Sequence, residues 1–174
     1  MSKKYKGPRQ SNNGLHVVPK TEKQKEFFEA IKTHPMTVAI GVAGTGKSWC
    51  PVMLAAKSLL KGEIDKIVLT RPNVDSGEPL GFSPGTQDEK MSEWLLEPLR
   101  VLRNVFGSND VDCKIKNGVI QMIPFQKMRS ITISDAFVIL DEAQNTTEKQ
   151  MELFSTRIGE NVRVIINGDI TQDD

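Results

Sequence analysis

Cysteine and long apolar runs are both scarce in this chain of 174 residues. Two cysteines, Cys50 and Cys113, are too few for a disulfide framework, which favours a reducing, cytoplasmic setting. No apolar run approaches the roughly 18 residues that a transmembrane helix needs, and the polar N-terminus lacks the apolar core of a signal peptide. The sequence therefore predicts a cytoplasmic protein with no membrane partner.

Histidine and net charge are also low. His16 and His34 stand far apart and without accompanying ligands, which argues against a histidine metal site. A net charge of +1 excludes an overall electrostatic footprint for nucleic acid. Basic residues nevertheless gather in the first segment, at Lys3, Lys4, Lys6, Arg9, Lys20, Lys23 and Lys25. We expect residues 1–20 to form a basic flexible arm, which either contacts phosphates or serves as a solubilising tail.

The segment 41–48 reads GVAGTGKS and fits the phosphate-binding pattern of glycine, four residues, glycine, lysine and serine or threonine. Apolar residues 37–40 predict a strand before it, and residues 49–60 predict a helix after it, in which Pro51 is a tolerated irregularity. Glycines let backbone N–H groups converge on phosphate at the helix N-terminus. The predicted nucleotide-binding residues are Gly41, Val42, Ala43, Gly44, Thr45, Gly46, Lys47 and Ser48. Lys47 is expected to reach the β- and γ-phosphates, and Ser48 to ligate Mg²⁺.

A second site is predicted where a buried strand ends. Residues 136–140 form a continuous apolar run, typical of a strand covered on both faces of a parallel sheet, and Asp141 and Glu142 follow it. Carboxylates at the carboxyl end of such a strand face the ligand crevice. Asp141 is suited to hold Mg²⁺, and Glu142 to orient and polarise an attacking water.

A third element comes near the end of the chain. Residues 162–166 predict another strand, which is followed by Asn167 and the string GDITQ at residues 168–172. Gln172 at the tip of that strand is a candidate catalytic residue, because a glutamine there can hydrogen-bond to the γ-phosphate or the water. The string alone is weak evidence, since Gly-Asp is ordinary turn chemistry.

Together these motifs resemble one family. GVAGTGKS, LTRPN at residues 69–73, VILDEAQNTT at 138–147 and GDITQ are similar to segments of PhoH-like ATPases, whose core is similar to the first motor domain of superfamily 1 helicases. The resemblance implies Mg²⁺-dependent ATP hydrolysis coupled to RNA or single-stranded nucleic acid, in a ring-shaped homo-oligomer. It also implies that Gln24 reads the adenine edge, although Gln24 equally fits an exposed helix position.

Members of that family continue past the matched segment, in a region with a basic residue proposed to act on the γ-phosphate. The resemblance implies that this C-terminal segment is absent here, so we expect slow turnover unless another arginine substitutes. Arg71, Arg129 and Arg157 are the candidates, and spacing alone cannot assign the role to any of them.

Alternating strand and helix patterns predict a three-layer α/β domain of the P-loop NTPase, RecA/helicase-like type over residues 21–174, with a mainly parallel sheet. Asn117 and Gly118 between two apolar runs predict a small β-hairpin insertion, with strands at 111–115 and 119–123. The other expected elements are helices at 22–31, 91–106 and 147–158, a strand at 66–70 and a long loop at 73–87.

Two other functions remain open on sequence grounds. A nucleotide-dependent binding or assembly module with little or no hydrolysis would fit the shortened C-terminus. A small phosphotransferase is disfavoured, because no lid with clustered arginines is evident and a glutamate beside the metal carboxylate suits water activation.

Overall fold

The computed structural model describes residues 18–42, 44–72, 96–169 and 171. The expected arm and the long loop lie largely outside these residues. Strands and helices alternate through most of the described chain, in the order α1 (Glu22–Thr33), β1 (Met36–Ile40), α2 (Trp49–Lys61), β2 (Lys66–Thr70), α4 (Leu96–Phe106), α5 (Ser108–Lys116), β3 (Ile120–Met122), the 3-10 helix η1 (Phe125–Ser130), β4 (Ala136–Leu140), the 3-10 helix η2 (Ala143–Asn145), α6 (Glu148–Ser155) and β5 (Val162–Gly168).

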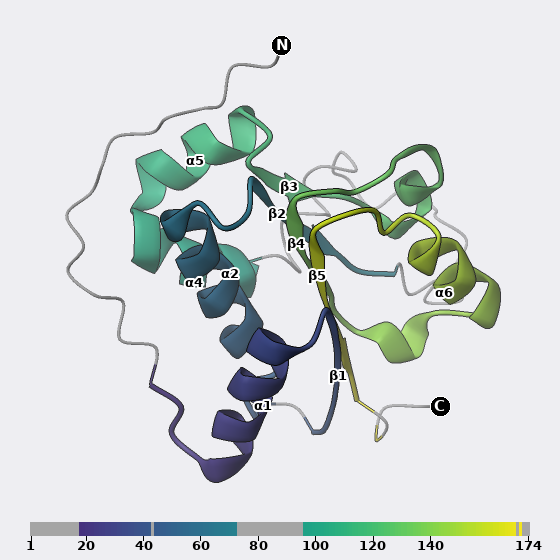
Figure 1. Ribbon diagram of the computed structural model, residues 1–174, viewed down its shortest axis with the longest axis horizontal. Helices are drawn as coiled ribbons and strands as arrows, with labels where there is room; N and C mark the ends of the chain where they lie inside the picture. The colour runs from purple at the N-terminus through teal and green to yellow at the C-terminus, as the bar shows by residue number, and fades with distance from the viewer. Residues whose placement is uncertain (1–17, 43, 73–95, 170, 172–174) are drawn as a thin grey trace, which may run out of the picture.

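The five described strands form one sheet, in the order β1-β5-β4-β2-β3, and every pairing is parallel (Figure 1). β4 lies in the middle and its five residues are all buried. This explains its continuous apolar sequence, because a central parallel strand is covered on both faces. The predicted parallel α/β sheet is confirmed.

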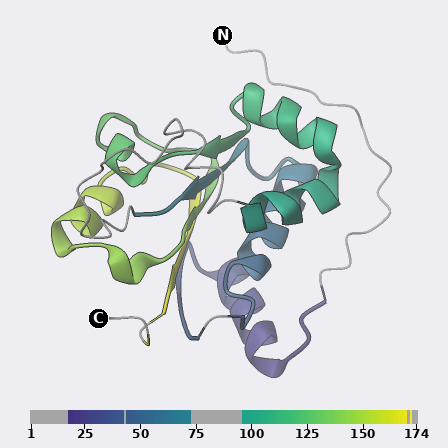
Figure 2. The ribbon, with the colours of Figure 1, turned by 180° about the vertical axis from the view of Figure 1, so that it is seen from behind.

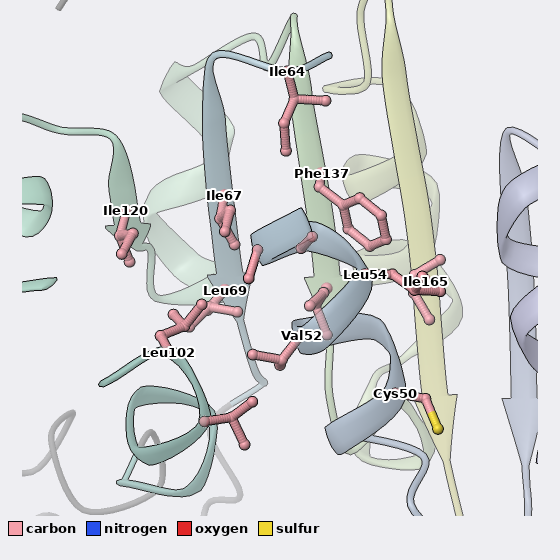
Figure 3. Close-up of a cluster of buried hydrophobic side chains, with 14 of the residues drawn as sticks. Cys50, Val52, Leu54, Ile64, Ile67, Leu69, Leu102, Ile120, Phe137 and Ile165 are labelled. Atoms are coloured by element: carbon pink, nitrogen blue, oxygen red, sulfur yellow. The ribbon is translucent and has the colours of Figure 1, made fainter. Parts of the chain in front are cut away.

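Helices cover both faces of the sheet, which gives three layers. α1, α2, α4 and α5 lie on one face and α6 on the other, as the front and back views show (Figures 1 and 2). Alternate side chains of β4 therefore belong to the cores on opposite faces of the sheet. Phe137 and Ile139 belong to the core under α2, whereas Val138 and Leu140 belong to the core that contains Phe154 of α6. Figure 3 shows the first of these cores, where Val52 and Leu54 of α2 lie over the sheet.

The predicted β-hairpin is wrong. Residues 108–116 form α5, and only residues 120–122 form a strand, which pairs in parallel with β2. Asn117 and Gly118 end the helix instead: the Asn117 N–H bonds to the Cys113 carbonyl, and Gly118 takes a φ of 70°. Because Asn and Gly favour helix C-termini as well as hairpin turns, the dipeptide fits both structures.

The helix ends follow local chemistry. Thr21 caps α1 by accepting a hydrogen bond from the Gln24 N–H, and Gly62 ends α2 in the left-handed conformation, with φ 71°. Pro51 lies in the first turn of α2, where a missing N–H costs least, and the helix continues to Lys61, so the expected irregularity is tolerated. In the described part of the chain, no helix is long and apolar enough to cross a membrane.

Candidate nucleotide site

The carboxyl ends of the strands meet at one edge of the sheet. The register pairs Ile40 with Gly168, Leu140 with Ile166 and Thr70 with Leu140, so the residues that follow β1, β2 and β4 lie together beside the end of β5. A cleft of about 510 Å³ opens there. It is lined by the phosphate loop, these strand ends, and Glu97 and Pro98 of α4. Parallel α/β sheets bind ligands at this edge.

The phosphate loop turns tightly into α2. Gly44 and Gly46 have φ values of 77° and 90°, which side chains with a Cβ rarely adopt. The Cys50 N–H bonds to the Gly46 carbonyl, so helical bonding begins within the loop. A Cβ on Gly46 would lie 3.1 Å from Nε2 of Gln24. Gly44 and Gly46 therefore take backbone conformations of the kind that let N–H groups converge on a phosphate. Ala43 lies outside the described residues.

The Lys47 ammonium group rests on its own loop. Nζ donates to the carbonyl oxygens of Gly41 and Val42, and lies 3.9 Å from Oδ2 of Asp169. These are exchangeable oxygen partners for a flexible cation. A phosphate group that enters the cleft would offer similar oxygens with more negative charge. We therefore expect the Lys47 ammonium group to exchange its present oxygen partners for the phosphate.

Asp141 and Ser48 face each other across the base of the cleft. The Ser48 hydroxyl lies 3.2 Å from Oδ1 of Asp141, and Asn167 Nδ2 donates to the same oxygen at 3.4 Å. Burial, and then the charge of Glu142, raise the pKa of the Asp141 carboxyl, while the Ser48 and Asn167 hydrogen bonds oppose the shift. A partly buried carboxylate beside a hydroxyl fits Mg²⁺, which prefers oxygen ligands and often takes one or two carboxylates together with substrate phosphates.

Glu142 has an unusual backbone. Its φ of 53° is a left-handed conformation for a non-glycine residue, of the kind that clusters at functional sites. Its Oε1 lies 3.9 Å from Nη2 of Arg71, and its Oε2 accepts a hydrogen bond of 2.6 Å from Nε2 of Gln144. The carboxylate is thus held from two sides while it lines the cleft.

Three residues join this site that sequence reasoning did not assign to it. Gln144 Oε1 accepts a hydrogen bond of 3.0 Å from the Asp169 N–H, so Gln144 links β5 to Glu142. Asp169 is buried and accepts from the backbone and hydroxyl of Thr171. Asn167, also buried, contacts Asp141. The sequence signal that could have identified these three residues was their place in the strings DEAQ, at residues 141–144, and NGD, at residues 167–169.

The remaining predicted residues fall into separate groups. Gln24 contacts the phosphate loop, because its Nε2 donates to the Thr45 carbonyl at 3.2 Å. Gln172 lies outside the described residues. Arg71 is in the cleft, whereas Arg157 lies elsewhere: its carbonyl accepts from Ile133 N–H just before β4 begins, and its Nη1 donates to the Arg129 carbonyl. Arg129 and Arg157 therefore contact each other outside the set of described residues that line the cleft.

The fold and this cleft define the class: a P-loop nucleotide-binding domain with the architecture of a helicase-type ATPase core. A solved structure of the Sulfolobus solfataricus SWI2/SNF2 ATPase core in complex with dsDNA shares the fold, with a TM-score of 0.54 at 13% identity, over 84% of this chain and 31% of that one.

The chain belongs to the PhoH-like protein family, which it matches over residues 16–174. It is 43% identical over 161 residues to a PhoH-like protein of Bacillus subtilis and 39% identical over 168 residues to Protein PhoH of Escherichia coli K12. The matches cover 92% and 95% of this chain but 50% and 48% of those relatives, so the chain spans about half their length.

Proposed function

We propose that this domain binds ATP with Mg²⁺ and hydrolyses it to ADP and phosphate. The observation that carries the proposal is the position of Glu142, a carboxylate held in the cleft next to Asp141, which itself faces Ser48 at the end of the phosphate loop. One carboxylate is then available for the metal and a second for the water.

Each residue has a separate task in this proposal. The loop N–H groups and Lys47 bind the phosphates, and Ser48 and Asp141 hold Mg²⁺, which would neutralise charge on the phosphate oxygens. Glu142 accepts the proton of the attacking water as the water oxygen bonds to the γ-phosphorus. The bond from that phosphorus to the β–γ bridging oxygen breaks, and ADP and inorganic phosphate leave. Gln24 contacts the adenine edge, and Gln172 contacts the γ-phosphate or the water; both roles rest on the family resemblance.

The cellular setting is part of the same proposal. We infer a cytoplasmic enzyme, since both cysteines are free thiols in the structure. Family resemblance supports RNA or single-stranded nucleic acid as the partner and a homo-oligomeric ring as the active assembly. Phosphate release measured with and without single-stranded RNA tests the partner: turnover that RNA leaves unchanged contradicts coupling to RNA.

The alternative is a nucleotide-dependent binding module with little hydrolysis. Lys47 should contribute to ATP binding whether the domain is an ATPase or a binding module, because it is the flexible cation of the phosphate loop. Lys47→Ala should therefore weaken ATP binding severely in calorimetry. Equal affinity in this variant would contradict nucleotide binding through the loop.

Glu142→Gln separates the two functions. It removes the proton acceptor and keeps the side-chain shape, so MgATP affinity should stay within a few-fold while turnover falls by about 10² or more. Glu152→Gln, at an exposed glutamate of α6, is the matched control and should leave both unchanged. Wild-type binding without phosphate release would favour the binding module.

A further inference from the structure

One buried polar atom beside the cleft has no hydrogen-bond partner among the described residues. Asn167 lies on β5, its side chain is fully buried, and its Oδ1 accepts no hydrogen bond there. A buried carbonyl oxygen without a partner costs stability, so such atoms are rare in native proteins and call for a water, an ion or a functional role to explain them. The other such atom in the described chain, Oγ1 of Thr37, belongs to a residue that does not line the cleft.

The strand order places Asn167 between the two halves of the candidate site. β5 pairs with β1, which leads into the phosphate loop, and with β4, which leads to Asp141 and Glu142. Ile165 belongs to the core under α2, and side chains two residues apart on a strand share a face of the sheet. Asn167 therefore lies on the face where α2 begins, and it lines the cleft together with Ser48 and Asp141.

The contact with Asp141 fixes which way the Asn167 amide group points. Nδ2 of Asn167 donates to Oδ1 of Asp141 at 3.4 Å. The flipped amide would set a carbonyl oxygen against the same carboxylate oxygen, and an ionised carboxylate has no hydrogen to donate. Nδ2 therefore stays with Asp141, and Oδ1 is the atom that is left for a further partner.

The hydrogen bond to Asp141 does not by itself explain a buried amide at this position. The Ser48 hydroxyl already lies 3.2 Å from Oδ1 of Asp141, and the Asn167 bond of 3.4 Å is longer than the usual range for N–H donors. An apolar side chain of the same size would avoid the unpaired carbonyl oxygen altogether. A partner that enters the cleft and donates a hydrogen bond to Oδ1 accounts for both polar atoms of the amide.

We propose that Oδ1 of Asn167 accepts a hydrogen bond from a water molecule in the coordination shell of Mg²⁺, when Ser48 and Asp141 hold that ion together with ATP. The inference rests on the proposed binding of MgATP. Mg²⁺ usually keeps several of its waters, and in an enclosed site the hydrogens of these waters need acceptors. Asn167 is then a positioning residue with two tasks: Nδ2 orients the Asp141 carboxylate, and Oδ1 orients the water beside it.

The test measures ATP affinity by calorimetry in excess Mg²⁺ and in EDTA, and the ratio of the two affinities is called the magnesium gain. Asn167→Leu has a similar size and neither polar atom, so the magnesium gain should fall by about ten-fold or more while the affinity in EDTA stays within about two-fold. Asn167→Asp keeps an acceptor and loses the donor, so it should keep the magnesium gain at the wild-type value or above it. Asn104→Leu, at an exposed asparagine of α4, is the matched control and should leave both affinities unchanged.

Two results would overturn this inference and leave the proposed function intact: a magnesium gain that Asn167→Leu does not change, or one that Asn167→Leu and Asn167→Asp both abolish. The second result would reduce Asn167 to a donor for Asp141. A wild-type affinity that does not depend on Mg²⁺ would instead contradict the proposed magnesium site itself, and this inference with it. If the thermal midpoint shows that Asn167→Leu does not fold, Asn167→Val removes the same two polar atoms with a smaller side chain and carries the same expectation.

Discussion

The Gln144 side chain joins the ends of two strands. Its Nε2 donates to Oε2 of Glu142 at 2.6 Å, and its Oε1 accepts from the Asp169 N–H at 3.0 Å. Each polar end of the amide thus has one partner, which fixes the direction of the side chain. Because Lys47 lies 3.9 Å from the Asp169 carboxylate, the lysine and the glutamate of the cleft are connected through this amide. We therefore expect Gln144 to act as a positioning residue for Glu142.

Gln144→Met tests this role, because methionine has a similar length and neither hydrogen bond. A hydrogen bond to a charged group contributes about 1.5–3 kcal/mol, so turnover should fall by about ten-fold or more while MgATP affinity stays within two-fold. In a Glu142→Gln background the same substitution should cost nothing further, since its effect passes through Glu142. Steady-state kinetics and calorimetry check both values. Additive losses, or an equal loss from Gln121→Met on β3, would exclude a positioning role.

The two thiols differ in environment. Cys50 is fully buried after the phosphate loop, and burial raises the pKa of its thiol to about 11. At pH 8 only about one Cys50 thiol in a thousand is then ionised, and the thiolate is the reactive form. A thiol reagent should therefore label Cys113 quickly and Cys50 only after unfolding, which absorbance at 412 nm with Ellman's reagent would measure. A fast phase that survives Cys113→Ser would contradict this assignment.

Residues whose partners are near in sequence were the easier ones to predict. Gly44, Gly46 and Lys47 belong to one continuous loop, and Asp141 follows a strand whose burial its own sequence indicates. Asn167 and Gln144 act through contacts 26 and 25 residues away along the chain. Spacing carries no information about such contacts, because they depend on the register between β4 and β5.

At the scale of elements, α6 begins with a capping box. Oγ1 of Thr147 accepts from the Gln150 N–H, and Oε1 of Gln150 accepts from the Thr147 N–H. Removing such a cap costs about 1 kcal/mol, which corresponds to about 2–4 °C in the thermal midpoint of a chain of this size. Thr147→Ala should show this decrease in calorimetry, and Thr147→Ser should retain most of the stability. Equal midpoints for both variants would mean that the cap does not stabilise the fold.

The strands and long helices followed from sequence, whereas α5 did not. β2 and β4 have the predicted bounds because their apolar runs are continuous and end at polar residues. In α5, Val111 is buried in the core and Lys114 is buried with its Nζ over the ring of Phe106. These two residues are three positions apart, so in a helix they lie on the same face. The short segment 111–115 is compatible with either period, so packing against α4 decides between helix and strand.

At the scale of the whole molecule, the candidate arginines divide by location. Arg71 reaches Glu142 within the same cleft. Arg129 and Arg157 are not among the described residues that line the cleft, and Nη1 of Arg157 donates to the Arg129 carbonyl at 3.4 Å. A head-to-tail ring with this pair at the subunit contact would bring the pair toward the cleft of the next subunit, because heterologous contacts repeat the same pair of surfaces around the ring. In such a ring these arginines would act on the nucleotide of a neighbour.

The double variant Arg129→Ala/Arg157→Ala should accordingly bind MgATP normally and lose turnover by about 10³, the scale of a catalytic arginine supplied by another subunit. Mixing it with Lys47→Ala chains should restore phosphate release, because the Lys47→Ala chains carry intact arginines beside the functional clefts of the double variant. The matched control is Lys127→Ala/Lys149→Ala, which removes the same charge from exposed positions of η1 and α6 and should keep full activity. Full turnover by the double variant, independent of protein concentration and in particles that light scattering identifies as monomers, would show that one chain supplies every catalytic group and leave Arg71 as the arginine that acts.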